Sequence, residues 1–197
     1  MATIGLKNLV YAPITEDNAG METYGTPVSL AKAISVGLSV ELNTGVLYAD
    51  DIEAEEVSEF KSGKLTLGVS DIGTENAAAL TGARIDANGV MISAKEDTAP
   101  HVAIGFAAPM SNGKDKYFWL YRVRFSVPAV NAETKSDSVK FSTPTIEGDV
   151  KRRNLADSEG GHPWKAEIVD GETTADAATI AAWFTEVYEP DTTMLSV

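Results

Sequence analysis

The sequence is poor in the side chains that most often perform chemistry. Among 197 residues it has no Cys and only two His, His101 and His162. The two imidazoles and a carboxylate could form a metal site, but nothing in their spacing brings them together, so we expect structural or surface roles for both. The lack of Cys excludes disulfides, thiolate zinc sites, iron–sulfur ligation and thiol catalysis.

Carboxylates are abundant, but their spacing is not typical of catalysis. Asp50-Asp51 invites comparison with the paired carboxylates of glycosidases. However, adjacent residues of an extended chain point to opposite sides. Asp71, Glu75 and Asp86 lack the spacing of a calcium loop, and no nucleophile elbow, P-loop or dinucleotide fingerprint is present. We therefore expect no enzyme activity, no cofactor and no bound metal.

The composition is that of an acidic globular domain. Asp and Glu number 29 against 16 Lys and Arg, a net charge of −13, which argues against a basic nucleic-acid footprint. No apolar run reaches the roughly 18 residues of a membrane span. The first twenty residues lack the regions of a signal peptide. We expect one domain with no membrane association.

Period-two alternation predicts strands. Residues 34–42 would bury their apolar side, with Ser and Glu on the other. Residues 64–70 repeat the pattern, and two Asn-Gly pairs, at 88–89 and 112–113, predict type I′ hairpin turns. The acidic stretch 49–62 shows no such pattern and predicts a long projecting loop.

The stretch 117–127 is the most informative predicted strand. Its alternation places six residues on one aromatic-rich core face: Tyr117, Trp119, Tyr121, Val123, Phe125 and Val127. The opposite face starts with Phe118 and Leu120 and continues with Arg122 and Arg124. A strand that is apolar on both sides at one end must be covered there by another segment.

The remaining patterns complete a mainly β fold. Further strands are predicted at 90–93, 101–108, 139–146 and 164–169, and a short helix at 71–82 that Gly82 ends. Near the C-terminus, one stripe of a three-turn helix would hold Ile180, Trp183, Phe184 and Val187. The prediction is an antiparallel β-sandwich or barrel-like domain over residues 1–190, with about eight strands, one or two short flanking helices and a loose tail at 191–197.

The few concentrations of basic residues suggest contacts between copies of the chain. Arg122 and Arg124 form one group, and Lys151, Arg152 and Arg153 form another. In so acidic a protein, these cations are natural partners for carboxylates of the projecting segment on a neighbouring copy; those carboxylates are Asp50, Asp51, Glu53, Glu55 and Glu56. The alternative is that both groups are solvated surface.

Taken in order, several segments resemble the major tail protein family of long-tailed, non-contractile phages and related prophages. They are residues 5–12 (GLKNLVYA), 24–27 (YGTP), 47–51 (LYADD), 99–106 (APHVAIGF), the aromatic strand 117–125, residues 134–135 leading into 139–141, and 183–187 (WFTEV). No single segment is specific; their order and spacing over residues 5–187 carry the resemblance.

The resemblance implies a structural virion protein. Members of this family form a β-sandwich or barrel-like domain that assembles into six-membered rings, and the rings stack into a tail tube through which the genome passes. The expected partners are further copies of the chain, other tail proteins at the tube ends, and double-stranded DNA that slides through without specific binding. The expected location is the virion, after synthesis in the bacterial host cytoplasm. A lumen lined with carboxylates would repel DNA phosphates, unless the acidic charge is mainly external.

A monomeric β-sandwich binding module, for example one for carbohydrate, is the alternative function. Tyr117, Trp119 and Tyr121 would then form an exposed aromatic platform. Their alternation with residues of a second face fits a core position better, and we therefore favour the tail-tube interpretation.

Overall fold

Eleven strands and two short helices make up the part of the chain that the computed structural model describes, residues 2–16, 21–49, 52–128 and 143–190. At 46–49 and 52–57 only the backbone is described. The fold is mainly β, with antiparallel sheets that do not close into a barrel, and it has two short helices. The predicted fold class is confirmed.

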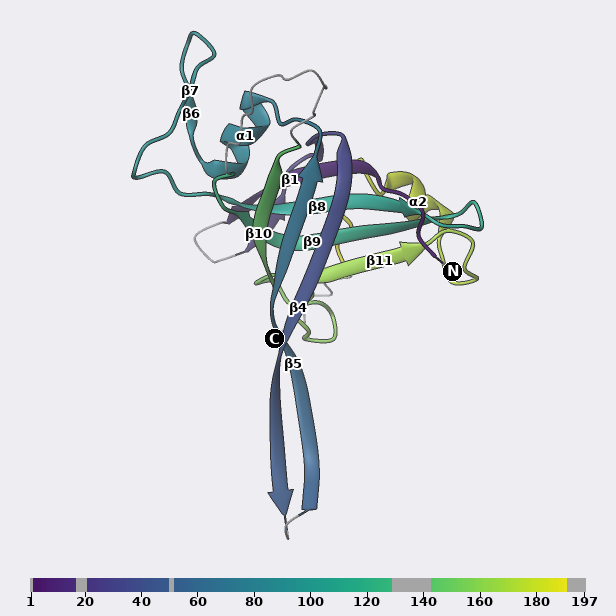
Figure 1. Cartoon of the computed structure of the whole chain (residues 1–197). Helices are drawn as coiled ribbons and strands as arrows, with labels where there is room; N and C mark the ends of the chain where they lie inside the picture. The colour runs from purple at the N-terminus through teal and green to yellow at the C-terminus, as the bar shows by residue number, and fades with distance from the viewer. Residues whose placement is uncertain (1, 17–20, 50–51, 129–142, 191–197) are drawn as a thin grey trace, which may run out of the picture.

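Nine strands form one twisted sheet with the order β2-β1-β8-β9-β10-β5-β4, while β3 pairs with β1 and β11 pairs with β9. The strands of this path and its side branches are β1 (Lys7–Glu16), β2 (Glu22–Tyr24), β3 (Val28–Ser29), β4 (Ala33–Ala49), β5 (Ile52–Val69), β8 (His101–Pro109), β9 (Asp115–Phe125), β10 (Thr145–Lys151) and β11 (Lys165–Val169). In Figure 1, β4, β5 and β10 cross in front of β8 and β9, so the sheet folds over on itself like a sandwich.

The main hydrophobic core lies between these two halves of the sheet. Leu65 and Leu67 of β5 face Ile104 of β8 and Leu120 of β9 in one buried cluster, and Leu80 of helix α1 (Thr74–Thr81) closes one end. The inward position of the β5 leucines agrees with the alternation of residues 64–70. Burial of these large side chains supplies most of the stabilisation of the fold.

A second apolar cluster lies on the other face of β1, β8 and β9. It consists of Ala12, Ala103, Trp119, Tyr121, Trp183 and Val187. The small residue Gly105 makes room for it: an added Cβ there would lie 2.8 Å from the Trp119 ring. The segment after helix α2 (Ala177–Ala182) covers this face. The expectation that something covers β9 on its second side is confirmed.

The side chains of β9 do not keep one face, as the alternation predicted. Tyr121 belongs to the outer cluster, but Val123 and Phe125 belong to the main core. Val127, expected on the core face, lies beyond the end of β9 and is 76% accessible. The pairing with β8 shifts here: Val102 pairs with Val123 and Ile104 with Leu120, so β9 holds one extra residue. This bulge reverses the alternation and corrects the prediction.

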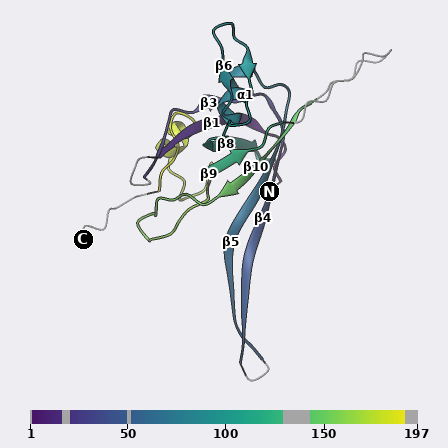
Figure 2. The same cartoon turned by 90° about the vertical axis from the view of Figure 1, so that its left-hand side faces the viewer.

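Strands β4 and β5 continue well beyond the sandwich as a two-stranded ribbon (Figures 1 and 2). The third strand, β10, pairs with β5 only over 63–68, whereas the β4–β5 pairing extends to Ala49 and Ile52. The acidic stretch 49–62 projects as expected. However, it is not an irregular loop, because residues 52–62 are strand; Asp50 and Asp51 lie outside the described residues.

The smaller elements lie where the sequence predicts them, but their turn types differ from the prediction. Helix α1 ends at Gly82, which has the expected left-handed conformation (φ +77°). The Asn-Gly pairs join β6 (Arg84–Ile85) to β7 (Met91–Ile92) and β8 to β9. The turns are not type I′, because only Gly89 and Gly113 have positive φ, whereas the preceding Asn residues do not.

The predicted bounds of the C-terminal helix and of the strand at 139–146 are corrected. Helix α2 has six residues instead of three turns; Asp176 caps it by accepting from the Thr179 N–H, and Trp183 to Val187 lie beyond it. The strand expected at 139–146 is β10, which begins at Thr145 and continues to Lys151. Residues 139–142 lie outside the described part of the chain, as does the tail 191–197.

Candidate assembly surfaces

Strand β4 is the edge of the sheet, and its apolar residues are exposed. Ile34, Leu38, Val40 and Leu42 are 55%, 36%, 42% and 53% accessible. Leu38 pairs with the fully buried Leu65 of β5, so the stripe lies on the core side of the sheet. The expectation of a buried apolar face is therefore wrong for this strand: it lies at the open side of the sandwich, where no further strand of the described ranges covers it.

A shallow groove of ≈ 460 Å³ runs along this open side. Ile34, Val36 and Leu38 form one wall, and Phe106 of β8 and Phe118 of β9 form the opposite wall. The rest of the lining is Thr3, Gly5, Leu6, Ser35, Ala108, Leu120 and Lys165. The groove continues the main core to the surface, so an added strand could extend the core there.

The opposite face of β10, β5 and β4 is polar and open to solvent. Along β10, exposed Glu147, Asp149 and Lys151 alternate with buried residues. Lys64 of β5 pairs with Glu147 at 2.7 Å, and Lys61 pairs with Glu41 at 2.9 Å. These pairs are exposed, so each contributes little to stability.

Arg122 is held inside its own subunit. Its guanidinium binds Glu22, which is buried, and Glu16 at 2.8 Å from Nη2 to Oε1. The other carboxylate oxygen of Glu22 accepts from the Asn154 N–H at 2.8 Å. The β9 bulge makes this cluster possible, because it places Arg122 on the outer face next to Tyr121. The prediction that Arg122 contacts a neighbouring subunit is therefore corrected.

Arg153 is also internal, with no accessible surface. Its guanidinium lies 5.6 Å from the Tyr24 ring centre and 5.3 Å from that of Tyr121, and it donates to Glu189 at 3.2 Å. It joins the sheet to the C-terminal segment. Arg153 therefore cannot meet a neighbouring copy, and this assignment is corrected as well.

Arg124, Lys151 and Arg152 remain exposed. Lys151 pairs across the ladder with Arg122, and Arg124 with Asp149, so the cations gather at one corner of the sheet. His101, which lies opposite Arg124 on β8, is close to these positive charges. Its pKa is lowered, first by burial and then by the nearby positive charges.

The expected acidic partners lie on the ribbon. Glu53, Glu55 and Glu56 belong to β5, where their backbone pairs with Tyr48, Leu47 and Val46 of β4, respectively. Asp50 and Asp51 lie outside the described residues. Within one chain the structure therefore places the backbones of the acidic and basic sets apart. The open apolar edge of β4 could not be predicted from the sequence, because the same alternation is typical of a buried strand.

The described residues hold no group of three His, Asp or Glu side chains arranged for a metal ion. His101 contacts Arg122 at 3.5 Å, and His162 contacts the Arg153 carbonyl at 3.2 Å, so they do not share a site. None of the helices within these ranges is long and apolar enough to cross a membrane. Comparison with models of known protein families and with curated proteins found no match.

Proposed function

We propose that this chain is a structural virion protein, the major subunit of a phage tail tube. Copies join side by side into six-membered rings, and the rings stack into a channel for DNA during ejection. Its partners are further copies of itself and the other tail proteins at the tube ends. DNA crosses the channel without specific binding, which fits a chain of net charge −13.

One observation carries the proposal: the long free edge of β4 combined with its exposed apolar stripe. An edge strand offers unpaired backbone groups to another chain, and proteins that stay monomeric usually protect such edges with charges, Pro or short strands. β4 is 17 residues long, and from Ala33 to Val40 it contains no charged residue and no Pro. A strand from a second copy would satisfy the backbone and cover Leu38 and Val40.

The ribbon adds independent support. A two-stranded ribbon is at best marginally stable alone in water, and from Leu42 to Phe60 no third strand within the described residues pairs with it. Contact with another subunit would give it a partner. A contact between the ribbon of one copy and a different surface of the next would be heterologous, and such contacts build rings or filaments instead of stopping at a dimer.

The carbohydrate-binding alternative depends on an aromatic platform. Trp119 and Tyr121 are fully buried beneath the C-terminal segment, and Tyr117 is half-buried against Trp183 and Phe184. The three side chains are thus part of an internal cluster. A sugar could stack on them only after this segment has moved away.

Electron microscopy of the concentrated protein in negative stain tests the proposal. We expect rings or tubes with a central channel, and a sedimentation profile that shifts to larger species as concentration rises. Featureless particles of constant monomeric mass at all concentrations, in the presence of the other tail proteins as well, would contradict it.

A further inference from the structure

Three cations at one corner of the sheet have no ion-pair partner among the described residues. Arg124, Lys151 and Arg152 are exposed and form no ion pair with any described residue. Elsewhere, most described cations are paired, and Lys114 and Lys116, for example, bind Asp170 and Glu167. A concentration of unpaired positive charge is unusual in a chain of net charge −13.

The strand register fixes where this basic corner lies. Lys151 ends β10 beside the base of the ribbon, because its neighbour Val150 pairs with Gly63 of β5. Arg124 follows on β9, and Arg152 comes directly after the strand. All three cations therefore sit on the body of the molecule, at the end from which the ribbon leaves.

The ribbon carries the complementary charge. Four carboxylates follow one another on β5, Glu53, Glu55, Glu56 and Glu59, and no Lys or Arg occurs between Thr44 and Phe60. The backbone of Glu53, Glu55 and Glu56 lies too far from the basic corner of the same chain for an ion pair. Glu56 is seven residues beyond Gly63 along a straight strand, about 23 Å away at roughly 3.3 Å per residue, and the ribbon leads away from the body (Figures 1 and 2).

We propose that the basic corner Arg124–Lys151–Arg152 binds the acidic ribbon of a neighbouring copy of this chain. The inference rests on the proposed assembly and specifies its contact surface. Each copy offers one ribbon and one corner, so the contact repeats from copy to copy. Repetition matters because a single exposed ion pair contributes only about 0–1 kcal/mol, whereas many such pairs act together in an assembly.

Charge reversal with rescue tests the pairing. The corner variant Arg124→Glu with Arg152→Glu is expected to raise the concentration needed for assembly by about tenfold or more, because attraction becomes repulsion. Adding Glu55→Lys and Glu56→Lys in the same chain restores the net charge of −13 and the complementarity with exchanged signs, and should recover most of the assembly.

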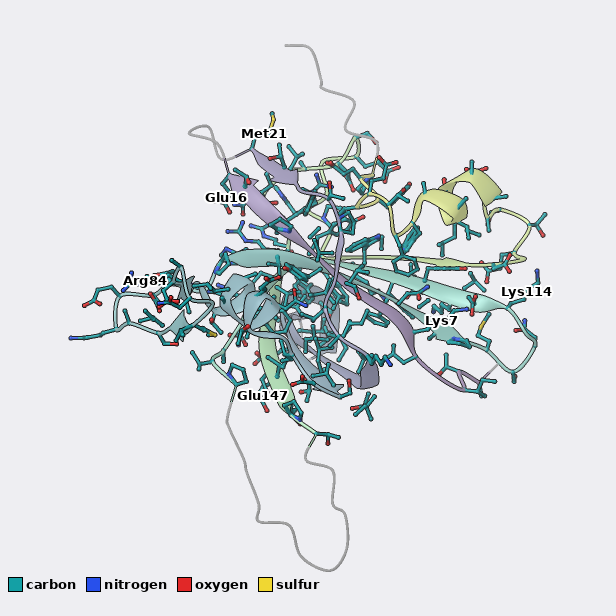
Figure 3. The ribbon with its side chains drawn as sticks, turned by 90° about the horizontal axis from the view of Figure 1, so that it is seen from above. Lys7, Glu16, Met21, Arg84, Lys114 and Glu147 are labelled. Carbon is teal, nitrogen blue, oxygen red and sulfur yellow. The ribbon has the colours of Figure 1, made fainter. Side chains whose placement is uncertain are left out.

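The chain offers a matched control. Arg84 and Lys95 are also exposed and unpaired within the described residues. They lie at the projection of α1, β6 and β7 and the loop after it, and Figure 3 shows Arg84 on this projection, away from the large sheet. Arg84→Glu with Lys95→Glu makes the same change in charge. We expect it to assemble at nearly the wild-type concentration. Its combination with the two ribbon lysines should assemble poorly, because the lysines would then face the unchanged basic corner of a neighbour.

The outcomes separate this inference from the proposed function. Assembly of the corner variant at the wild-type concentration, or equal loss in the corner and control variants, would overturn the pairing while leaving the proposed function intact. Failure of the wild-type chain to assemble would count against the proposed function. Thermal unfolding of the monomers checks that each variant folds, which we expect because all substituted body residues are exposed.

Discussion

Arg152 and Arg153 are neighbours in sequence and opposite in environment: one is exposed, and the other lies buried between two tyrosine rings. Arg153→Ala removes the stacking and the bond to Glu189, and it leaves a cavity the size of a large side chain. We expect a loss of about 2–4 kcal/mol in the free energy of unfolding, measured by chemical denaturation. Arg152→Ala is the control and should change stability by about 0.5 kcal/mol at most. Equal effects would show that Arg153 is not a structural link.

The tyrosines around Arg153 make the fold sensitive to alkali. Burial raises the pKa of Tyr24 and of Tyr121 well above the ordinary value. Each phenol therefore keeps its proton in the folded state at a pH where the unfolded chain loses it. This contribution is fully present below about pH 10, the pKa of an unfolded tyrosine, and declines as the pH rises above it.

Removing these hydroxyls should reduce that sensitivity. Neither Tyr24 Oη nor Tyr121 Oη has a hydrogen-bond partner among the described residues. Tyr24→Phe with Tyr121→Phe should therefore be nearly neutral at neutral pH, or slightly stabilising. The variant should retain more of its stability above about pH 10 than the wild type. Denaturation curves at several pH values measure this, and an identical alkaline decline in both proteins would contradict it.

Among the elements, the C-terminal segment packs against the sheet as a structural layer and does not extend from it as a free arm. Trp183 is 2% accessible and packs against Trp119, whose indole N–H donates to the Trp183 carbonyl at 3.0 Å. Trp183→Ala should cost about 3–5 kcal/mol and lower the melting temperature. Ile180→Ala, at a half-buried position of α2, should cost clearly less. An unchanged melting temperature for Trp183→Ala would mean that the segment is dispensable.

The ribbon is the element whose order should depend on assembly. Among the described residues, its distal backbone bonds form only between β4 and β5, and isolated hairpins open readily. In the free monomer, we expect rapid amide exchange from Leu42 to Phe60 and slow exchange in the strands around Leu65 and Leu120. Assembly should protect the ribbon. Hydrogen exchange on both states measures the difference, and equal protection in each would contradict the expectation.

How far the elements could be predicted depends on whether local or distant contacts decide them. Local alternation located β5, β8 and β9 and the inward leucines of β5, because period and burial coincide there. The bulge at Tyr121 could not be predicted, since it arises from the pairing with β8. The acidic ribbon was missed for a related reason: its strand conformation comes from the backbone of β4, while its own composition opposes burial.

At the scale of the whole molecule, the open edge of β4 is the part of the candidate site that sequence alone describes incorrectly. A strand has the same alternating sequence pattern whether its apolar face packs on the core of its own subunit or on that of a neighbour. Burial in the single chain distinguishes the two cases, and here Val40 and Leu42 remain exposed. The basic residues show the same limit, because Arg122 and Arg153 find partners far away in sequence.

Blocking this edge gives a prediction in which charge and interface have opposite effects. Val40→Lys with Leu42→Lys makes the chain two charges less negative, which by itself reduces repulsion between copies and favours association. On the apolar stripe, however, the two lysines would have to be buried against a neighbour, and such lysines prevent edge pairing. We expect assembly to be lost, with an unfolding transition close to that of the wild type because both positions are exposed.

The matched control places the same charges on the other face of the same strand. Ser39→Lys with Asn43→Lys adds two lysines at exposed polar positions of β4, and this variant should assemble at least as readily as the wild type. Sedimentation and negative-stain images of both variants measure the difference. If both assemble alike, the apolar stripe is not buried between subunits, and the contact between copies must lie elsewhere on the molecule. If only the stripe variant fails, although its net charge is more favourable, burial of the β4 face is what joins the subunits.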